Sequence, residues 1–243
     1  MMVHRKILQK ERNCWNIGSA TETGLLVDGR QYFRAFYKAA RAAENYIVIS
    51  GWQFDSDVPL LYGPDADSAG EPANFLAFLN SLCEQNDRLR IYILAWDFTA
   101  LYSLDREWFQ GWYFNWMTNE RLKFSFDCCH TFAASHHQKF VVIDGTMAFV
   151  GGLDLCSARW DDRDHRAENP YRVKRDQTPY APFHDVQSFH VGPVGGYLAD
   201  LFKNRWSLIC GESLNLPPPT SNSRMTFEPT LRIAANEVAI SRT

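Results

Sequence analysis

Three residues in the middle of the chain have the types and the spacing that phosphate chemistry needs. His137, Lys139 and Asp144 form the pattern H-x-K-x4-D within the segment SHHQKFVVIDG. Side chains at positions i and i+2 of a strand point to the same face, so an extended segment projects His137 and Lys139 together. The ammonium can neutralise an anionic oxygen, and its charge keeps the imidazole neutral and nucleophilic. The pattern therefore indicates a site for a phosphate-bearing substrate.

The residues that follow this pattern predict a tight hairpin. An apolar strand over Gln138–Ile143 leads into Asp144-Gly145, a hairpin-turn signal, and then into a second strand over Met147–Val150. Gly151 and Gly152 come next, and their missing side chains let a ligand or another strand approach the backbone. The hairpin thus fixes the spacing between the histidine–lysine pair and the glycine pair.

Strands and helices alternate along the rest of the chain, which predicts an α/β fold. Apolar residues that recur every three or four positions indicate helices, and short apolar runs indicate buried strands. Besides the hairpin, the predicted strands are Leu25–Val27, Tyr46–Trp52, Leu89–Ala95 and Val186–Val191, and the predicted helices are Gln31–Ala43, Phe75–Cys83 and Tyr197–Trp206. Gly63–Asn74 and the charged stretch Arg159–Pro182 are expected to be surface loops.

The composition excludes several classes of protein. The 243 residues are 46% hydrophobic and 22% charged, with a net charge of −3, which excludes a wholly disordered chain and disfavours a nucleic-acid coat. No apolar run is long enough to cross a membrane, and no secretory signal opens the chain. We therefore expect a cytoplasmic protein with reduced thiols that is at most peripheral at a membrane.

The last thirty residues predict a domain boundary. Leu214–Ser223 (LNLPPPTSNS) reads as a linker, and Glu237–Ser241 reads as a strand followed only by Arg-Thr. We therefore expect one domain over residues 1–213 and the start of a second lobe over residues 214–243, in a chain that is cut short. The alternative is a frayed edge strand at the C-terminus.

Three further features have competing structural explanations. The stretch Cys128–His137 (CCHTFAASHH) could suggest zinc, but adjacent cysteines suit the usual ligand spacings poorly, so we expect no metal there. Trp108, Trp112 and Trp116 predict an aromatic stripe on a helix, either a lipid-facing rim or, as we favour, core packing. The charge runs DDRDH and RVKRD predict a solvated loop, with contact to a lipid headgroup as the alternative, and His165 within the first run receives no role.

The stretch Ser135–Asp161 resembles the first HKD motif of the phospholipase D superfamily, in particular its eukaryotic-type and related bacterial branch. That branch reads close to HH-x-K, four hydrophobic residues and D, followed by FVGG-[IL]-D-L and R-[WY]-D, and FVGGLDL and RWD follow the motif here. Gly29–Trp52 and Pro182–Trp206 also resemble segments of the family. The resemblance runs from about Cys14 to Cys210, and it implies a phospholipase D-like lobe with a mixed sheet flanked by helices on both faces.

The resemblance also implies roles for individual residues. His137 would attack phosphorus and form a phosphohistidine, while Lys139 would hold the phosphate oxygens and Asp144 would support the geometry of the motif. Asp185 would orient the nucleophilic histidine by accepting its Nδ1–H. The residues implied in substrate binding are Lys139, Gly151, Gly152 and Asp154.

The chain departs from the family in the number of motifs. The family's active site uses two histidines, one as the nucleophile and one as the acid that protonates the leaving alcohol. The full pattern H-x-K-x4-D occurs once here. The resemblance therefore implies a second HKD lobe, either beyond Thr243 or in a second copy of the chain.

The function implied is a phosphodiesterase that hydrolyses or transfers phosphatidyl groups of glycerophospholipids at a membrane surface, including cardiolipin-synthase-like transfer. This chemistry calls for no metal and no cofactor, because a lysine supplies the positive charge. One alternative is a phosphodiesterase that acts on nucleic acid, which the net charge disfavours. The other is a non-catalytic lobe that serves as a binding module.

Overall fold

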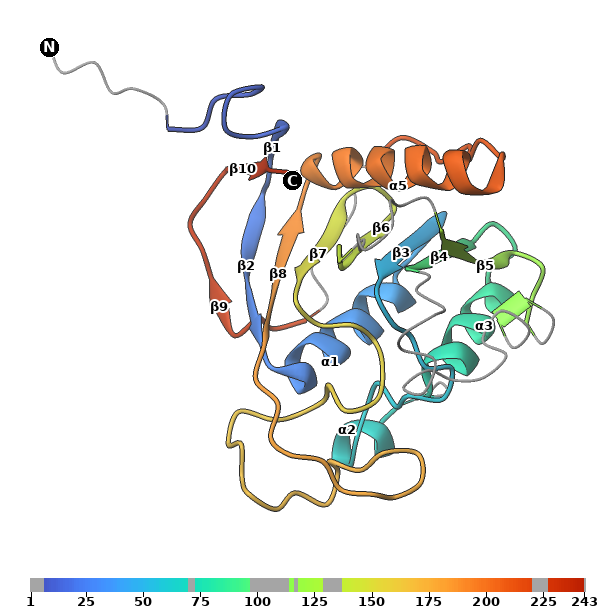
Figure 1. The fold of residues 1–243 in the computed structure, drawn as a ribbon, viewed down its shortest axis with the longest axis vertical. Helices are drawn as coiled ribbons and strands as arrows, with labels where there is room; N and C mark the ends of the chain where they lie inside the picture. The colour runs from blue at the N-terminus through green and yellow to red at the C-terminus, as the bar shows by residue number, and fades with distance from the viewer. Residues whose placement is uncertain are drawn as a thin grey trace, which may run out of the picture.

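The computed structural model describes residues 7–69, 73–96, 114–115, 118–128, 137–219 and 227–242. Its centre is an eight-stranded sheet with the order β5-β4-β3-β6-β7-β8-β2-β9, beside a small sheet formed by β1 and β10 (Figure 1). The strands are β1 (Asn16–Ser19), β2 (Glu22–Val27), β3 (Tyr46–Gly51), β4 (Arg90–Trp96), β5 (Leu122–Asp127), β6 (Phe140–Ile143), β7 (Met147–Gly151), β8 (Val186–Val191), β9 (Leu231–Arg232) and β10 (Glu237–Ile240). The helices are α1 (Gly29–Arg41), α2 (Pro64–Asp67), α3 (Phe75–Gln85) and α5 (Val194–Cys210).

Helices cover both faces of the large sheet. On β3, Ile47 and Ile49 belong to the apolar cluster that includes α1 and α3, whereas Tyr46 and Val48 belong to the cluster beneath α5. Figure 1 shows α5 across one side of the sheet and α1 and α3 on the other. Strands β3, β4 and β5 are parallel, and β3, β6, β7, β8 and β2 pair antiparallel in turn. The predicted mixed α/β sheet with helices on both faces is confirmed.

Short elements at the edges differ from the sequence-based prediction. Helix α2 lies inside the stretch Gly63–Asn74 that we expected to be a loop, and it is one turn begun by Pro64. Strands β1, β5 and β9 were not predicted, because each has polar or small residues interspersed and lies at the margin of a sheet. Trp108, Trp112 and Trp116, which were predicted to form an aromatic stripe, lie outside the described residues.

The C-terminal segment packs against the rest of the fold. Strand β10 pairs antiparallel with β1, with Asn16 opposite Ile240. Leu214, at the start of the predicted linker, is buried in the cluster beneath α5. The boundary after residue 213 stays a prediction. None of the described helices is both long and apolar enough to cross a bilayer.

Candidate active site

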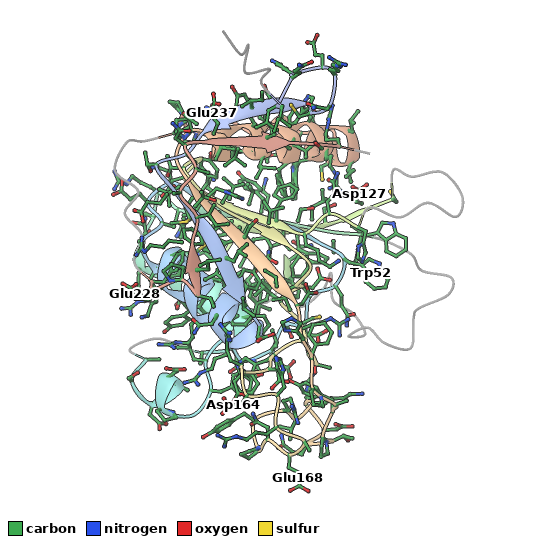
Figure 2. The ribbon with its side chains drawn as sticks, turned by 90° about the vertical axis from the view of Figure 1, so that its left-hand side faces the viewer. Trp52, Asp127, Asp164, Glu168, Glu228 and Glu237 are labelled. Atoms are coloured by element: carbon green, nitrogen blue, oxygen red, sulfur yellow. The ribbon has the colours of Figure 1, made fainter. Side chains whose placement is uncertain are left out.

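The histidine and the lysine of the motif lie together at the beginning of β6, beside one tryptophan at the end of β3. The His137 ring meets the Trp52 ring edge-on, with ring centres 5.4 Å apart, and Lys139 Nζ lies 5.5 Å from the centre of the same ring. His137 is exposed, whereas Lys139 is only 6% exposed. The expected projection of both side chains to one place is therefore what the structure shows. Trp52 lies at the same side of the molecule as Asp127 (Figure 2).

A buried carboxylate meets the charge of the lysine. Asp154 Oδ2 lies 3.1 Å from Lys139 Nζ, and its Oδ1 accepts a hydrogen bond from the backbone N–H of Trp52 at 2.8 Å. A side chain at Gly51 would bring its Cβ to 2.7 Å from the same Oδ1, so the glycine leaves the room that Asp154 occupies. Asp154 thus joins the end of β3 to the lysine, and its part in substrate binding stays a prediction.

The surroundings of His137 favour its neutral form. Partial burial is the largest cause, and the positive charge of Lys139 adds to it, so the pKa of His137 lies below its usual value although Asp154 acts in the opposite direction. A neutral imidazole keeps a lone pair for attack on an electrophile. The electrostatics expected from the motif are therefore present.

Asp144 occupies the other end of β6 and serves the hairpin. Its carboxylate accepts hydrogen bonds from the backbone N–H groups of Glu44, Asn45 and Tyr46 at 2.8–2.9 Å. Asp144 and Gly145 both have positive φ angles, 49° and 70°, as the predicted tight turn requires. The carboxylate thus ties the β6–β7 turn to the beginning of β3 and supports the motif without reaching the histidine.

Asp185 packs against the glycine pair that follows β7. A Cβ at Gly152 would lie 2.3 Å from Asp185 Oδ1, and a Cβ at Gly151 would lie 2.5 Å from the carbonyl oxygen of Val186. Asp185 Oδ1 accepts the N–H of Val186 at 2.7 Å, and among the described residues no hydrogen bond joins Asp185 to His137. The glycines therefore make room for the segment that carries Asp185, and its orienting role stays a prediction.

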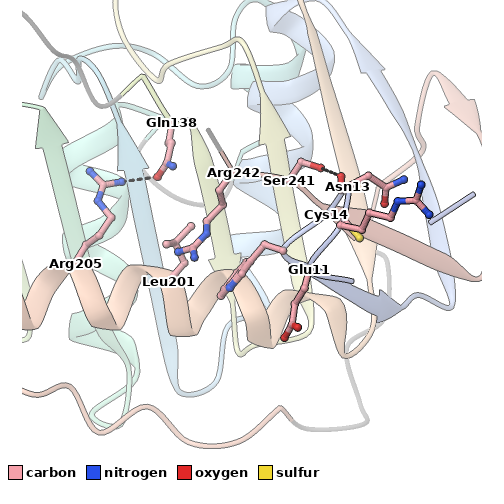
Figure 3. Close-up of a pocket in the computed structure, with 10 residues that line it drawn as sticks. Glu11, Asn13, Cys14, Gln138, Leu201, Arg205, Ser241 and Arg242 are labelled. Carbon is pink, nitrogen blue, oxygen red and sulfur yellow. Dashed lines mark hydrogen bonds between the residues drawn. The ribbon is translucent and has the colours of Figure 1, made fainter. Parts of the chain in front are cut away.

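A second polar cluster, not found from the sequence, lies behind the motif on the α5 face. Arg205 donates from Nη1 to Gln138 Oε1 at 2.9 Å and to Ser50 Oγ at 3.2 Å, and its Nε donates to Asp127 Oδ2 at 3.0 Å. Figure 3 shows the bond between Arg205 and Gln138 at the wall of a cavity of about 710 Å³. Gln138 stands between His137 and Lys139 in the sequence, so this cluster holds the beginning of β6 from the opposite side.

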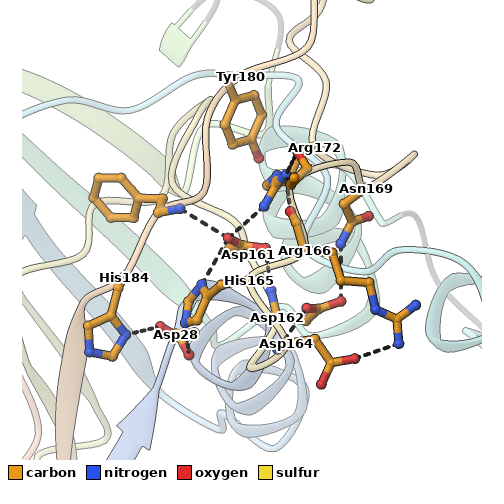
Figure 4. A network of polar contacts seen from close by, with 12 residues as sticks. Asp28, Asp161, Asp162, Asp164, His165, Arg166, Asn169, Arg172, Tyr180 and His184 are labelled. Carbon is orange, nitrogen blue, oxygen red and sulfur yellow. Dashed lines mark hydrogen bonds and ion pairs between the residues drawn. The ribbon is translucent and has the colours of Figure 1, made fainter.

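The charged excursion between β7 and β8 corrects one expectation, because its two charge runs are not simply solvated. Asp161 is fully buried and its Oδ2 lies 3.0 Å from Nη1 of Arg172, which is also buried. The same oxygen accepts the N–H of Phe183 and faces His165 Nδ1, each at 3.0 Å (Figure 4). One residue from each charge run therefore forms the interior of the excursion.

The rival zinc stretch is only partly described. Cys128 is exposed, and residues 129–136 lie outside the described residues. The expected absence of a metal in that stretch stays a prediction.

Comparisons with known proteins agree with this architecture. Residues 39–230 match the model of the family described as Phospholipase D. The chain belongs to the phospholipase D family. Phospholipase D1 of Saccharomyces cerevisiae is 28% identical over 216 residues, which are 76% of this chain and 13% of the yeast protein. Phospholipase D C of Dictyostelium discoideum is 26% identical over 218 residues, 74% of this chain and 12% of that protein.

One solved structure adds support at the level of the fold. The phosphatidylserine synthase of Haemophilus influenzae superposes with a TM-score of 0.52 at 14% identity, over 88% of this chain and 43% of that chain. This phospholipase D family chain thus spans about an eighth of the length of the curated relatives it matches. The motif predicted from the sequence lies within the matched residues, and so do Asp154, Asp185 and Arg205.

Proposed function

We propose that this chain is one lobe of a phosphodiesterase that hydrolyses or transfers phosphatidyl groups of glycerophospholipids. The observation that carries the proposal is the pairing of an exposed histidine of lowered pKa with a buried lysine, both against Trp52. A buried ammonium that lies beside a nucleophile at the surface suits an anionic phosphodiester. The membership of the phospholipase D family supports the same chemistry.

In the proposed reaction His137 supplies an electron pair from one ring nitrogen to phosphorus, and the bond from phosphorus to the headgroup oxygen breaks. Lys139 stabilises the negative charge that grows on the non-bridging oxygens, so its ammonium turns partly from Asp154 toward the phosphate. The headgroup leaves with a proton from the histidine of a second HKD lobe, in cis or in trans. Water or an alcohol then attacks the phosphohistidine and gives its proton to that second histidine, and its oxygen replaces the nitrogen of His137 on phosphorus.

A substrate with a good leaving group tests this lobe by itself. Phosphatidyl-p-nitrophenol releases a phenolate that needs no protonation, so the 243-residue chain in mixed micelles should give a burst of up to one equivalent without a second histidine. His137→Ala should abolish the burst, and Lys139→Met should slow it by about 10²–10³-fold, as loss of one charge-stabilising donor does. His190→Gln, on β8 and outside the motif, is the matched control and should keep the burst.

Three results would contradict the proposal. An undiminished burst in folded His137→Ala would remove the assigned nucleophile. A burst with bis(p-nitrophenyl) phosphate or a thymidine p-nitrophenyl ester but none with the lipid would move the substrate to another class of diester. Lipid binding without any burst would make the lobe a binding module.

A further inference from the structure

A cluster of two histidines and one aspartate lies outside the motif, where three distant segments meet. Asp28 follows β2 at the beginning of α1, His165 lies in the excursion, and His184 precedes β8. One side-chain ligand atom from each residue lies within 4.8 Å of the other two. The three groups converge beside Asp161 (Figure 4). Sequence reasoning missed them because nothing in their spacing brings them together.

One ring nitrogen of His165 contacts the carboxylate of Asp161, which is not one of the three clustered residues. His165 Nδ1 lies 3.0 Å from Asp161 Oδ2, and that oxygen also accepts hydrogen bonds from Arg172 Nη1 and from the N–H of Phe183. Asp161 is therefore fixed in place and favours the tautomer of His165 that carries its proton on Nδ1. A histidine whose far nitrogen donates to a carboxylate is the common arrangement at metal sites, because it fixes the ring and raises its basicity.

The other ring nitrogen of His165, Nε2, faces Asp28 Oδ2, an oxygen that lacks a hydrogen bond. Asp28 is 1% exposed, and its Oδ2 makes no hydrogen bond although it lies 3.2 Å from His165 Nε2. In the tautomer that Asp161 favours, this nitrogen presents a lone pair to the carboxylate oxygen. Two acceptors at this distance repel each other, so a cation must lie between them, either a proton on His165 Nε2 or a metal ion.

The third group can close the site from the solvent side. His184 Nδ1 lies 2.6 Å from Asp28 Oδ1, and its side chain is 64% exposed, so the ring can turn without disturbing the core. Ligands on a tetrahedral zinc ion lie about 3.3 Å apart, given bonds of about 2.0–2.2 Å. Side-chain movements of about 1 Å would bring the three atoms to that spacing and leave the fourth position for water.

We propose that Asp28, His165 and His184 bind a divalent first-row metal ion, with Zn²⁺ as the best match to two imidazoles and one carboxylate. Binding displaces the proton that His184 Nδ1 shares with Asp28, and this proton goes to solvent. The metal would fasten the excursion to the beginning of α1, next to Asp185, whose carbonyl oxygen accepts the N–H of Asp28 at 2.9 Å. None of the three ligands belongs to the histidine–lysine motif, and the proposal does not depend on the chemistry of the motif.

The test uses the 243-residue chain, stripped with chelator and then titrated with Zn²⁺ or Co²⁺. One equivalent of zinc should stay bound through gel filtration, and Co²⁺ should give the intense visible absorption of a tetrahedral site. At a free zinc concentration about 100-fold above Kd, the Tm should rise by roughly 5–10 °C. These readouts need no enzymatic activity.

Variants decide whether the bound ion lies at this cluster. His184→Ala removes an exposed ligand and should weaken zinc binding by at least 10-fold while the metal-free chain keeps its Tm, whereas His190→Gln should bind as the parent does. Asp28→Asn, which keeps the shape of the side chain, should also weaken binding. The double variant Cys128→Ser and Cys129→Ser removes the rival zinc stretch and should change nothing.

Each opposite result would overturn the site. Zinc lost during gel filtration, or an octahedral Co²⁺ spectrum, would mean that a proton alone lies between His165 and Asp28. Equal zinc binding by His184→Ala and the parent would exclude the cluster. Loss of the bound equivalent in the double cysteine variant, with His184→Ala unaffected, would assign the ion to residues 128–137.

Discussion

At the scale of single residues, the charge of Lys139 is balanced before any substrate arrives. Asp154 Oδ2 lies 3.1 Å from its ammonium, and both side chains are buried. A buried cation without a partner would cost several kcal/mol, so the carboxylate of Asp154 offsets the burial of the Lys139 ammonium. In the proposed reaction, a phosphodiester would bring its own negative charge and compete with Asp154 for the ammonium. The ion pair can thus stabilise the buried ammonium while leaving it able to bind a substrate.

Lys139 and Asp154 also affect the pKa of His137, which can be measured. The pKa is lowered by burial first and by Lys139 second, while Asp154 raises it. Lys139→Met removes a lowering cause and leaves the raising one, so the pKa of His137 should rise. Ring-proton NMR titration checks this, with His190 as an internal reference because its pKa is lowered by burial alone. An unchanged or lower pKa of His137 would show that the lysine does not act on it.

In the parent chain, the lowered pKa of His137 keeps the ring neutral at a lower pH than is usual for a histidine. A step that requires the neutral ring should therefore persist as the pH falls below about 6.5, the usual histidine pKa. It should then be lost as the pH falls through the lowered pKa. The Lys139→Met variant should lose the step at a higher pH than the parent.

The residues found from the sequence are those whose partners lie close by in the chain. His137 and Lys139 stand two positions apart just before β6, so their common direction could be predicted from the two-residue period of an extended segment. Arg205 and Asp127 form their ion pair across 78 residues, and Asp28 meets His184 across 156. No local period relates such positions, which is why the cluster behind the motif and the histidine cluster came only from the structure.

At the scale of elements, the motif aspartate acts as a joint between the β6–β7 hairpin and β3. Asp144 is buried and accepts three backbone N–H groups from consecutive residues. Such charge-assisted bonds are worth about 1.5–3 kcal/mol each, and they leave buried donors when the acceptor is lost. The element that carries the histidine is therefore positioned from its far end.

Asp144→Asn should lower the free energy of unfolding by roughly 2–4 kcal/mol, because one amide hydrogen pair would face the backbone donors. Urea unfolding measures the change, with Asp87→Asn as the control, since that side chain is 94% exposed. A loss below about 0.5 kcal/mol would mean that the three bonds contribute nothing net. If the variant fails to fold, Asp144→Glu gives a milder version of the same test.

Gly152 offers a way to move Asp185 without changing it. A Cβ at Gly152 would lie 2.3 Å from one oxygen of that carboxylate, the mobile end of the side chain, so the aspartate must turn away. Gly152→Ala should therefore reduce the nitrophenolate burst as strongly as Asp185→Asn does, with a Tm loss of only a few degrees. Gly196→Ala is the control, since its Cβ would approach Pro219 Cγ no closer than 3.4 Å. Full activity in Gly152→Ala would separate Asp185 from the chemistry.

Most long elements could be predicted because each carries its own apolar pattern. The buried run Tyr46–Trp52 became β3, and the run Leu89–Ala95 became β4 with a shift of one residue. Strand β5, with Lys123 and Ser125 facing away from the apolar cluster, depends on pairing with β4. Edge strands of this kind owe their structure to a neighbour, so their own sequences indicate them weakly.

At the scale of the whole molecule, the excursion from Arg159 to Pro182 forms a compact body with a charged interior. Arg172 is fully buried, and its guanidinium donates to Asp161 and to the carbonyl oxygens of Arg166 and Ala167. Outside the excursion, Asp161 accepts from Phe183, and its carbonyl oxygen accepts from Arg30. The excursion is thus held together by Arg172, and Asp161 joins it to α1 and to the segment before β8.

Arg172→Met should open the excursion and leave the sheet folded. The substitution removes the cation from Asp161 and leaves two carbonyl groups without their donor, a loss of about 3–5 kcal/mol for a broken buried pair. All the hydrogen bonds of the guanidinium go to residues 161–167, so the loss stays local. Chymotrypsin should then cleave at Tyr171 or Tyr180 at least 10-fold faster than in the parent. Arg166→Met, whose side chain is exposed, should be cleaved at the parental rate.

The position of the cuts distinguishes local opening from general instability. Cleavage confined to residues 160–183, with an unchanged far-ultraviolet circular dichroism spectrum, would show that the sheet survives without the excursion. Simultaneous cleavage near Phe36 or Phe78, which are buried residues of α1 and α3, would show instead that the excursion is part of one cooperative unit with the core. In that case Arg172 stabilises the whole molecule, and the charged excursion belongs to the fold as fully as any strand.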